Sequence, residues 1–481
     1  MNAHKQSTQR FSFYIKIMLA LFAHSAIIKS WTDTRLTPEY SSLFFEPAQL
    51  DIIQEGATPI VRTHHQDKKP WTVIVYIAAD NDLRGFAARN IKQMASVGSN
   101  EHINILVHLD IRIAGNQKIT RRYYIENNRI LHVNPGDPET ERMDSGSPKT
   151  LQSCCKWAIK HYPADHYALI MWNHGTGTLD PLRGRILNPT QLFEFNPTIN
   201  KFDIDRSIEF FDWVDGRRGI CWDDTTGNYL TNQKLASALN HVCTKYLGGK
   251  KLSILAFDAC LMSMIEVANI AQDYADIMVG SQEVELGTGY NYALALEPFA
   301  HHALTPDDFA KQIVKAYEKS YSNITNDYTQ SAMNLSLTRG VEQNINLVAH
   351  LLVECLKQQK NNSVKINLRR SRNKLCCTHF DEPRYVDLHH LYKNILKNMS
   401  GFSIAGGDSG NSLLRQLQQA LEHGLRLIEK AVIANTAGRN LSQARGISIY
   451  FPEDVIHPSY PRTSFASTNE WLHFIQAYIR N

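Results

Sequence analysis

Residues 71–110, WTVIVYIAADNDLRGFAARNIKQMASVGSNEHINILVHLD, decide the fold class. They begin with a continuous apolar run rich in β-branched side chains, which is typical of a strand covered on both faces. The next segment carries apolar residues on roughly one side at helical spacing, and Gly98 suits the end of that helix. A second apolar run, INILVHLD (103–110), completes a strand–helix–strand unit. Such a unit predicts a largely parallel sheet with helices packed on it.

Similar strand and helix patterns recur along the chain. Further strands are predicted at YALIMWNHG (167–175), KLSILAFDAC (251–260) and ADIMVGSQE (275–283), and a hairpin at RRYYIENNRILHVN (121–134). Beyond residue 300 the pattern is mainly helical, with helices expected over Asp307–Tyr321, Gln343–Gln358, Leu388–Leu396 and Ser412–Asn435. The chain is then expected to close with a strand at ARGISIYFP (444–452).

The composition is that of an ordinary globular protein. The chain has 481 residues, enough for two or three domains, with 43% hydrophobic and 20% charged residues. A formal net charge of +4 is too small on this length to indicate nucleic acid or an anionic surface as a partner. The sequence contains no paired C-x2-C motif, no His-rich tract and no phosphate-binding loop, so neither a zinc site nor nucleotide binding is predicted.

The N-terminus has the form of a signal peptide. Residues 1–30 contain basic residues, then a short apolar run (17–23), then small residues, which predicts export and removal of this segment. The alternative is an amphipathic N-terminal helix. Residues 31–70 are polar and proline-containing and are interpreted as a linker or pro-segment. No later stretch is long and apolar enough to predict a membrane span, and the eight cysteines, with two adjacent doublets, do not suggest a disulfide scaffold.

Two predicted strands end in reactive side chains. One ends in Asn173-His174-Gly175 and another in Asp258-Ala259-Cys260. Because the carboxyl ends of parallel strands meet at one edge of a sheet, Cys260 and His174 are expected to lie together. The imidazole would take the thiol proton and later protonate the leaving amine, and the backbone N–H groups of Gly175 and Cys260 would bind the oxyanion. The alternative is that Cys260 is a small buried filler and His174 a structural residue.

Eight blocks in this order resemble the clostripain family of cysteine peptidases: WTVIVYIAADNDL, INILVHLD, ALIMWNHGTG, GICWDDTTGNYLTNQKLASAL, ILAFDACLMSMIEVA, GSQEVELGTGYNY, YVDLHHL and GISIYFP. The resemblance runs from Trp71 to Pro452 and implies a caspase-like α/β/α sandwich with a mostly parallel sheet. Caspases, gingipains and legumain-type enzymes share this fold. The implied division is a catalytic core (71–300) with an insertion or processing loop (176–228), and a helix-rich C-terminal region (301–481).

The resemblance also implies roles for individual residues. The family's histidine falls on His174 and its nucleophile on Cys260. The acidic residue two places earlier falls on Asp258, in the pocket that accepts Arg or Lys before the scissile bond, where a buried carboxylate favours a cation. Asp258 could instead cap a helix that begins near Cys260. Thr288 stands where a second pocket carboxylate is expected, so a relaxed specificity remains open.

Family members are typically activated by cleavage between the histidine and the cysteine. The basic candidates here are Arg183, Arg185, Arg217 and Arg218, and the pair Arg217-Arg218 is the preferred site. The alternative is a charged loop that is never cut. No cofactor is required for the chemistry. Calcium dependence is known among relatives, and Asp223 and Asp224 are candidate oxygen ligands.

These observations predict an exported cysteine endopeptidase that acts on protein or peptide substrates through Cys260 and His174, after Arg or Lys. Neither nucleic acid nor stable membrane insertion after signal removal is expected. One alternative is a catalytically silent relative that binds a partner protein. Another is a transpeptidase or ligase that uses the same thioester chemistry.

Overall fold

The computed structural model describes residues 58–59, 67–113, 117–134, 140–180, 192–206 and 220–480. The predicted signal peptide, most of the expected linker and the pair Arg217-Arg218 lie outside these residues. The described chain belongs to one unit that begins at Ala48. Among the described helices, none has the length and hydrophobicity that a bilayer crossing demands.

A ten-stranded sheet forms the centre of the fold, in the order β1-β5-β4-β3-β2-β6-β11-β12-β13-β15. The five central strands, β3 to β12 in this order, run parallel, and the strands added at either side are mostly antiparallel. The strands are β1 (Thr58–Pro59), β2 (Lys69–Ala79), β3 (Ile103–Arg112), β4 (Lys118–Glu126), β5 (Arg129–His132), β6 (Ala164–Trp172), β11 (Leu252–Asp258), β12 (Ala275–Gly280), β13 (Thr329–Asn334) and β15 (Val432–Ala437). The predicted mostly parallel sheet is confirmed.

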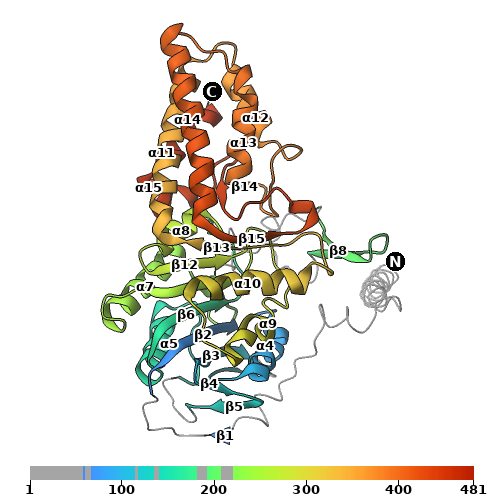
Figure 1. Cartoon of the computed structure of the whole chain (residues 1–481), viewed down its shortest axis with the longest axis vertical. Helices are drawn as coiled ribbons and strands as arrows, with labels where there is room; N and C mark the ends of the chain where they lie inside the picture. Colours follow the sequence, from blue (N-terminus) through green and yellow to red (C-terminus); the bar gives the residue numbers. More distant parts are fainter. Residues whose placement is uncertain are drawn as a thin grey trace, which may run out of the picture. The chain divides into compact units, whose positions relative to one another are not determined.

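Helices cover both faces of the sheet, which gives the expected α/β/α sandwich (Figure 1). One group packs together as α5 (Pro148–His161), α7 (Asn232–Lys245) and α8 (Ile265–Ala271). The other consists of α4 (Arg84–Val97), α9 (Tyr292–Leu296) and α10 (Pro306–Tyr321). Because both faces are covered, β2 is buried from Trp71 to Ala79, as its continuous apolar sequence predicts.

Local sequence signals set the ends of these elements. Gly98 ends α4 with a φ of 72°, a conformation that glycine adopts without the strain of a side chain. Thr231 caps α7 by accepting a hydrogen bond from the N–H of Lys234. The hairpin between β4 and β5 turns at Asn127-Asn128, where Asn128 has a φ of 54°. The helix predicted within residues 71–110 and the predicted hairpin are therefore confirmed.

The residues beyond 300 are largely helical, but they also extend the main sheet through β13 and β15. The expected helix over Ser412–Asn435 is observed as α14 (Asp408–Ala431), and its last residues instead form β15. Pairing of β15 with β13 stabilises the strand there, an effect of tertiary structure that local periodicity does not reveal. Region 301–481 therefore shares its sheet with the core.

The last helices form an elongated bundle in the upper part of Figure 1. They are α11 (Thr338–Gln358), α12 (Ser363–Arg372), α13 (Leu388–Asn398), α14 and α16 (Trp471–Arg480). The strand expected at 444–452 is β16 (Ser448–Tyr450), which pairs with β14 (Tyr385–Asp387) in a separate small sheet. It does not close the chain, because α15 (Ser464–Thr468) and α16 follow it.

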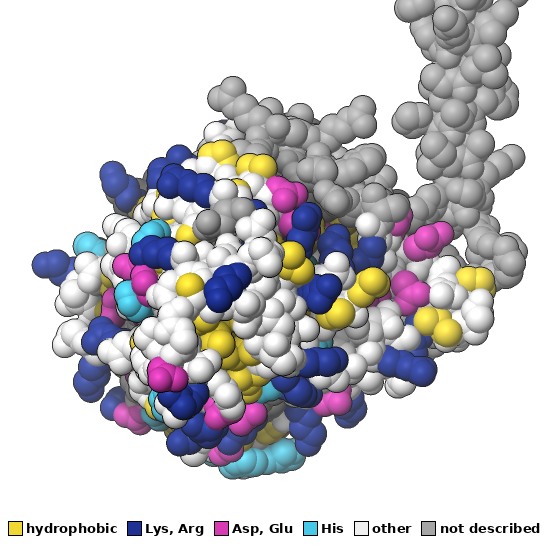
Figure 2. Space-filling view, turned by 90° about the horizontal axis from the view of Figure 1, so that it is seen from above, with side chains coloured by type: hydrophobic (Ala, Val, Ile, Leu, Met, Phe, Trp, Pro, Cys, Tyr) yellow, Lys and Arg dark blue, Asp and Glu magenta, His cyan; other side chains and the backbone are white. Residues whose placement is uncertain are grey.

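Viewed from the helical end, the described surface carries Lys and Arg side chains spread among acidic, polar and apolar ones (Figure 2). The basic residues on this face are dispersed and do not gather in one place. This distribution agrees with the small net charge of the chain.

Candidate active site

The two reactive strand ends lie side by side. β6 and β11 are parallel neighbours, and Trp172, the last residue of β6, is in register with Asp258. The N–H of Asn173 donates to the carbonyl oxygen of Asp258 over 3.2 Å, which continues the pairing beyond the strands. His174 and Cys260 therefore leave the same edge of the sheet as close neighbours, as the carboxyl-end rule predicts.

One pocket at this edge contains both residues. Its lining consists of Leu83, Trp172, Asn173, His174, Leu192, Asp258, Ala259, Cys260, Glu285, Leu286, Gly287 and Gly289. Cys260 is 8% exposed and His174 is 3% exposed. Leu192 comes from the described part of the insertion, where β7 (Phe193–Asn196) and β8 (Lys201–Ile204) form a hairpin. Thus the described part of the insertion contributes one residue to the pocket lining.

The thiol of Cys260 rests against the backbone of Glu285. Its Sγ accepts a hydrogen bond from the Glu285 N–H over 3.2 Å and lies 3.9 Å from the Glu285 carbonyl oxygen. Burial raises the pKa of the Cys260 thiol well above its usual value. A neutral thiol of this kind needs a base to become a nucleophile. Leu261, the next residue, has a φ of 63°, which is rare for a bulky side chain and is typical of strained turns at functional sites.

The two residues expected to supply the oxyanion donors are in close backbone contact. A Cβ atom on Gly175 would overlap the carbonyl oxygen of Cys260, so only glycine permits this approach. Among the described residues, neither the Gly175 N–H nor the Cys260 N–H has a hydrogen-bond acceptor. An oxyanion donor must be free of another acceptor in this way.

Asp258 and Glu285 place a pair of carboxyl groups in the pocket. Asp258 accepts hydrogen bonds from the Tyr290 N–H (2.9 Å) and the Tyr292 hydroxyl (2.8 Å), and its carboxyl group also contacts that of Glu285. Burial raises the pKa of Asp258 to about 7, and burial together with the charge of Asp258 raises the pKa of Glu285 well above its usual range. One proton shared between the two carboxyls follows from this arrangement, because two buried like charges in contact repel.

Two sequence-based expectations for this pocket are wrong. Thr288 does not line it, because the Thr288 hydroxyl is buried against the Tyr321 hydroxyl at 2.8 Å. Nor does Asp258 cap a helix near Cys260, because α8 begins at Ile265 and its N-cap residue is Met264. The segment after Cys260 is a turn, held by the hydrogen bond from the Leu261 N–H to the Glu283 carbonyl oxygen.

Two residues of the site were not predicted from the sequence. Glu285 follows β12, the neighbour of β11, and supplies the second carboxyl. Asp82 follows β2, the neighbour of β6, and its Oδ1 lies 2.7 Å from Nε2 of His174. Both come shortly after strands whose carboxyl ends meet at this edge, so the rule that grouped His174 with Cys260 could also have identified them.

The proposed calcium ligands are already paired with cations of the chain. Asp223 is fully buried and forms an ion pair with Lys118, and Asp224 lies 2.8 Å from the Arg112 guanidinium. An ammonium group therefore occupies the space where a metal ion would contact Asp223, and these residues do not fit a calcium site. Within the described ranges, no cluster of three or more His, Cys, Asp or Glu side chains has the geometry to hold a metal ion.

A family model and a curated protein match this chain. The model of the Clostripain family matches residues 75–185 and 212–477. Clostripain from Hathewaya histolytica is 28% identical over 244 residues, which cover 46% of this chain and 40% of that protein. The chain thus spans about two-fifths of the length of this curated relative.

Solved structures show the same fold. A secreted C11 cysteine protease from Bacteroides thetaiotaomicron, in complex with an irreversible peptide inhibitor, aligns with a TM-score of 0.53 and 19% identity over 86% of this chain and 100% of that one. An inactive zymogen C11 protease from Parabacteroides distasonis aligns with a TM-score of 0.51 and 20% identity over 86% of this chain and 99% of that one. At these identities the likeness establishes the fold alone.

Proposed function

The chain belongs to the clostripain family, and we propose on this premise that it is an exported cysteine endopeptidase that cleaves after Arg or Lys. The observation that carries the proposal is that one pocket holds a thiol, an imidazole and two carboxyl groups, from Cys260, His174, Asp258 and Glu285. The first two supply the chemistry, and the last two select the substrate.

The proposed catalytic steps begin from the neutral thiol of Cys260. His174 takes the proton of Cys260, and the thiolate attacks the scissile carbonyl carbon while the N–H groups of Gly175 and Cys260 stabilise the oxyanion. The imidazolium then gives its proton to the leaving amine, and an acyl-enzyme remains on the sulfur. Water, deprotonated by His174, hydrolyses this thioester and restores the thiol.

The lining of the pocket accounts for the choice of side chain. Leu83, Trp172 and Leu286 provide apolar walls that suit the methylene stem of Arg or Lys. Asp258 and Glu285 can accept the cationic end, which forms charge-assisted hydrogen bonds with carboxylates. A neutral side chain would offer these buried carboxyl groups no opposite charge and would bind less well.

Export and processing are part of the same proposal. The signal-peptide pattern in residues 1–30 supports export, and the pair Arg217-Arg218 matches the proposed specificity of the enzyme itself. The intact mass of the purified chain tests both. Cleavage after Arg217 or Arg218 in the wild type, and its absence in Cys260→Ala, would support self-processing. The same cleavage in both chains would assign it to another protease.

The activity is tested with peptides that differ only at the residue before the scissile bond. Purified wild type is expected to hydrolyse peptides with Arg or Lys there, to hydrolyse the norleucine peptide much more slowly, and to lose all activity in Cys260→Ala and His174→Ala. Equal hydrolysis by wild type and Cys260→Ala would contradict the proposal.

The same assay separates the alternatives. A wild-type chain that neither hydrolyses peptides nor reacts with a thiol-directed peptide probe at Cys260 would be a silent, partner-binding relative. A chain that joins the acyl group to an added amine in preference to water would be a transpeptidase or ligase, which product analysis by mass spectrometry detects.

A further inference from the structure

The imidazole of His174 has a carboxylate neighbour from a third strand end. Nε2 of His174 lies 2.7 Å from Oδ1 of Asp82. The Asp82 side chain is 26% exposed and that of His174 is 3% exposed, so solvent screens the contact only in part. When Nε2 donates its proton to Asp82, Nδ1 carries the lone pair and is the nitrogen that can take a proton from the thiol.

The position of Asp82 is fixed by the residue before it. Asn81 is almost fully buried, and its Oδ1 accepts a hydrogen bond from the Leu83 N–H over 2.9 Å. Its Nδ2 donates to the carbonyl oxygens of Ala78 (2.9 Å) and Trp222 (3.1 Å). These bonds close the turn that carries Asp82 and tie it to β9 (Ile220–Asp223).

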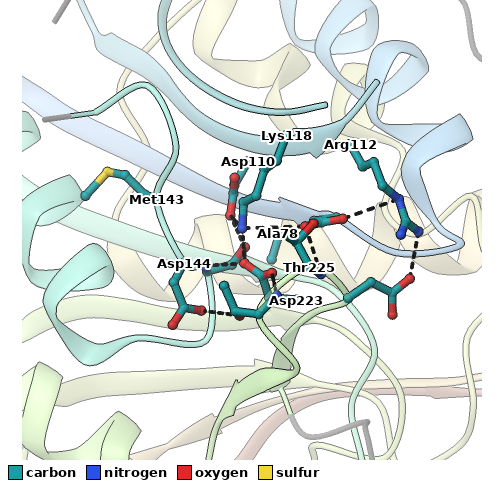
Figure 3. A network of polar contacts seen from close by, with 12 residues as sticks. Ala78, Asp110, Arg112, Lys118, Met143, Asp144, Asp223 and Thr225 are labelled. Atoms are coloured by element: carbon teal, nitrogen blue, oxygen red, sulfur yellow. Dashed lines mark hydrogen bonds and ion pairs between the residues drawn. The ribbon is translucent and has the colours of Figure 1, made fainter. Parts of the chain in front are cut away.

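Asp80 anchors the same turn to a buried ion network. Its carbonyl oxygen accepts from the Asp224 N–H (2.8 Å), and its carboxylate accepts from the Thr225 N–H (3.2 Å). Nζ of Lys118 lies 3.6 Å from Oδ2 of Asp80 and 2.9 Å from Oδ2 of Asp110. Figure 3 shows Lys118 reaching toward Asp110 and Asp223 in this network.

We propose that Asp82 is a positioning residue for His174: it orients the imidazole, selects the tautomer with the proton on Nε2, and stabilises the imidazolium formed during catalysis. The contacts of Asn81 and Asp80 hold Asp82 in place for this role. The inference rests on the proposed function, because it takes His174 as the base for Cys260. A carboxylate hydrogen-bonded to a catalytic histidine acts in this way on unrelated folds.

Replacement of Asp82 is expected to act through the protonation of His174. A nearby carboxylate favours the charged imidazolium, so removal of its charge lowers the pKa of the imidazole. The replacement of Asp82 leaves the other titratable side chains of the pocket in place, namely Cys260, Asp258 and Glu285. A change in the acid limb of the pH profile therefore reports on Asp82 and His174.

The experiment compares full-length wild type with Asp82→Asn, which keeps the shape but removes the charge, and Asp82→Glu, which keeps a carboxylate. The matched control is Asp165→Asn, at the opposite end of β6, where Asp165 pairs with the exposed Lys68. In Asp82→Asn, kcat is expected to fall about 100-fold with KM within a few-fold, and the acid limb of the kcat profile to move to lower pH. Asp82→Glu should recover part of kcat, and Asp165→Asn should match wild type.

A second measurement does not depend on peptide turnover. The alkylation rate of Cys260 by iodoacetamide, followed by peptide mass spectrometry, reports the thiolate that His174 helps to form. At neutral pH the alkylation rate is expected to fall about tenfold in Asp82→Asn, which corresponds to a one-unit change in the pKa of the imidazole. In His174→Ala the rate should fall at least as far.

The outcomes are distinguishable. Wild-type chain that alkylates as expected, with a slower Asp82→Asn, but hydrolyses no peptide would refute the proposed function and support the role of Asp82. An active wild type with an unchanged kcat, acid limb and alkylation rate in Asp82→Asn would overturn the inference alone. A loss of kcat with an unmoved acid limb and no recovery in Asp82→Glu would also overturn it, because it would indicate a merely structural role.

Discussion

Gly175 lies so close to Cys260 that a Cβ atom added to it would overlap the carbonyl oxygen of the cysteine. Because the contacting atom belongs to the backbone, it cannot move aside as the end of a flexible side chain can. The histidine strand and the cysteine strand are therefore joined at their ends by a contact that tolerates no side chain, and the proposed oxyanion donors belong to the same two residues.

We expect Gly175→Ala to lower kcat by about 100–1000-fold, the loss that follows removal of one oxyanion donor. The added methyl group must displace the backbone of Cys260 and so separates the two donors. Peptide hydrolysis measures kcat, and circular dichroism verifies the fold. The control is Gly340→Ala in α11, where the nearest atom to the added Cβ is a Leu427 methyl at 3.9 Å. Full activity in Gly175→Ala would show that the oxyanion site lies elsewhere.

The second prediction concerns the carboxyl that replaces the one expected at position 288. Glu285→Gln is expected to reduce the preference for Arg over norleucine by about 10–100-fold, or about 1.4–2.8 kcal/mol, because it removes one of the two carboxyl groups that the substrate cation can meet. The measured quantity is the ratio of kcat/KM for the two peptides, which is insensitive to a general loss of activity.

Thr288→Val is the matched control for Glu285→Gln. It removes the hydroxyl that contacts Tyr321 and leaves the pocket lining unchanged. Its substrate preference should equal that of wild type. A change in preference in Thr288→Val, with none in Glu285→Gln, would return the specificity role to position 288.

The sequence predicted the parts of the fold that depend on local pattern. Strands β2 and β3 are continuous apolar runs because helices cover both faces of the sheet, and this pattern can be recognised from the sequence alone. The periodicity of the sequence predicts a helix over the first residues of β15, because their strand conformation depends on pairing with β13, a strand about a hundred residues earlier.

The pocket residues also divide into those that local pattern predicts and those that tertiary contacts position. His174 and Cys260 follow long strands, so their meeting could be predicted from strand direction. The position of Glu285 depends on the loop after β12, whose course is set by tertiary contacts: Gly289 has a φ of 57° and packs directly on the Asp258 carboxylate. Neighbouring positions in such a loop face different ways, so the resemblance places the second pocket carboxyl at position 288, whereas the structure has Glu285 in the pocket.

The ionisation of Asp258 leads to a third prediction. A bound Arg or Lys side chain favours the charged form of the Asp258 carboxyl, so binding strengthens as pH rises through the pKa of Asp258, about 7. KM for an Arg peptide should therefore fall between pH 6 and 8, whereas KM for a norleucine peptide should stay constant or rise. Parallel profiles for the two peptides would contradict a titrating pair in the pocket.

The fourth prediction is that chelation of divalent cations leaves peptide hydrolysis unchanged. Lys118 and Arg112 already neutralise Asp223 and Asp224, so loss of calcium has no ligand set to disturb there. Activity with and without EDTA, and the melting temperature with and without added calcium, measure this. A calcium-dependent rise in melting temperature that is lost in Asp224→Asn would show that calcium displaces these ion pairs.

The fifth prediction concerns the stability of the ion network beneath Asp82. Lys118→Met removes the cation from among the buried carboxylates of Asp80, Asp110 and Asp223. Breaking a buried pair in this way typically costs about 3–5 kcal/mol of unfolding free energy. Urea denaturation of wild type and Lys118→Met measures the difference. The control Lys68→Met removes an exposed partner of Asp165 and should change stability by less than about 1 kcal/mol.

The loss in Lys118→Met should depend on pH in a defined direction. Burial raises the pKa of Asp110 to about 7 from 3.8, so between these values the folded state binds more protons than the unfolded state. This contribution to stability is present at low pH and decreases as pH rises toward 7. Without Lys118 the folded-state pKa rises further, because an attractive cation is gone. The deficit of Lys118→Met should therefore be smaller at pH 5.5 than at pH 8, and an equal deficit at both would indicate that the lysine does not act through the charge of Asp110.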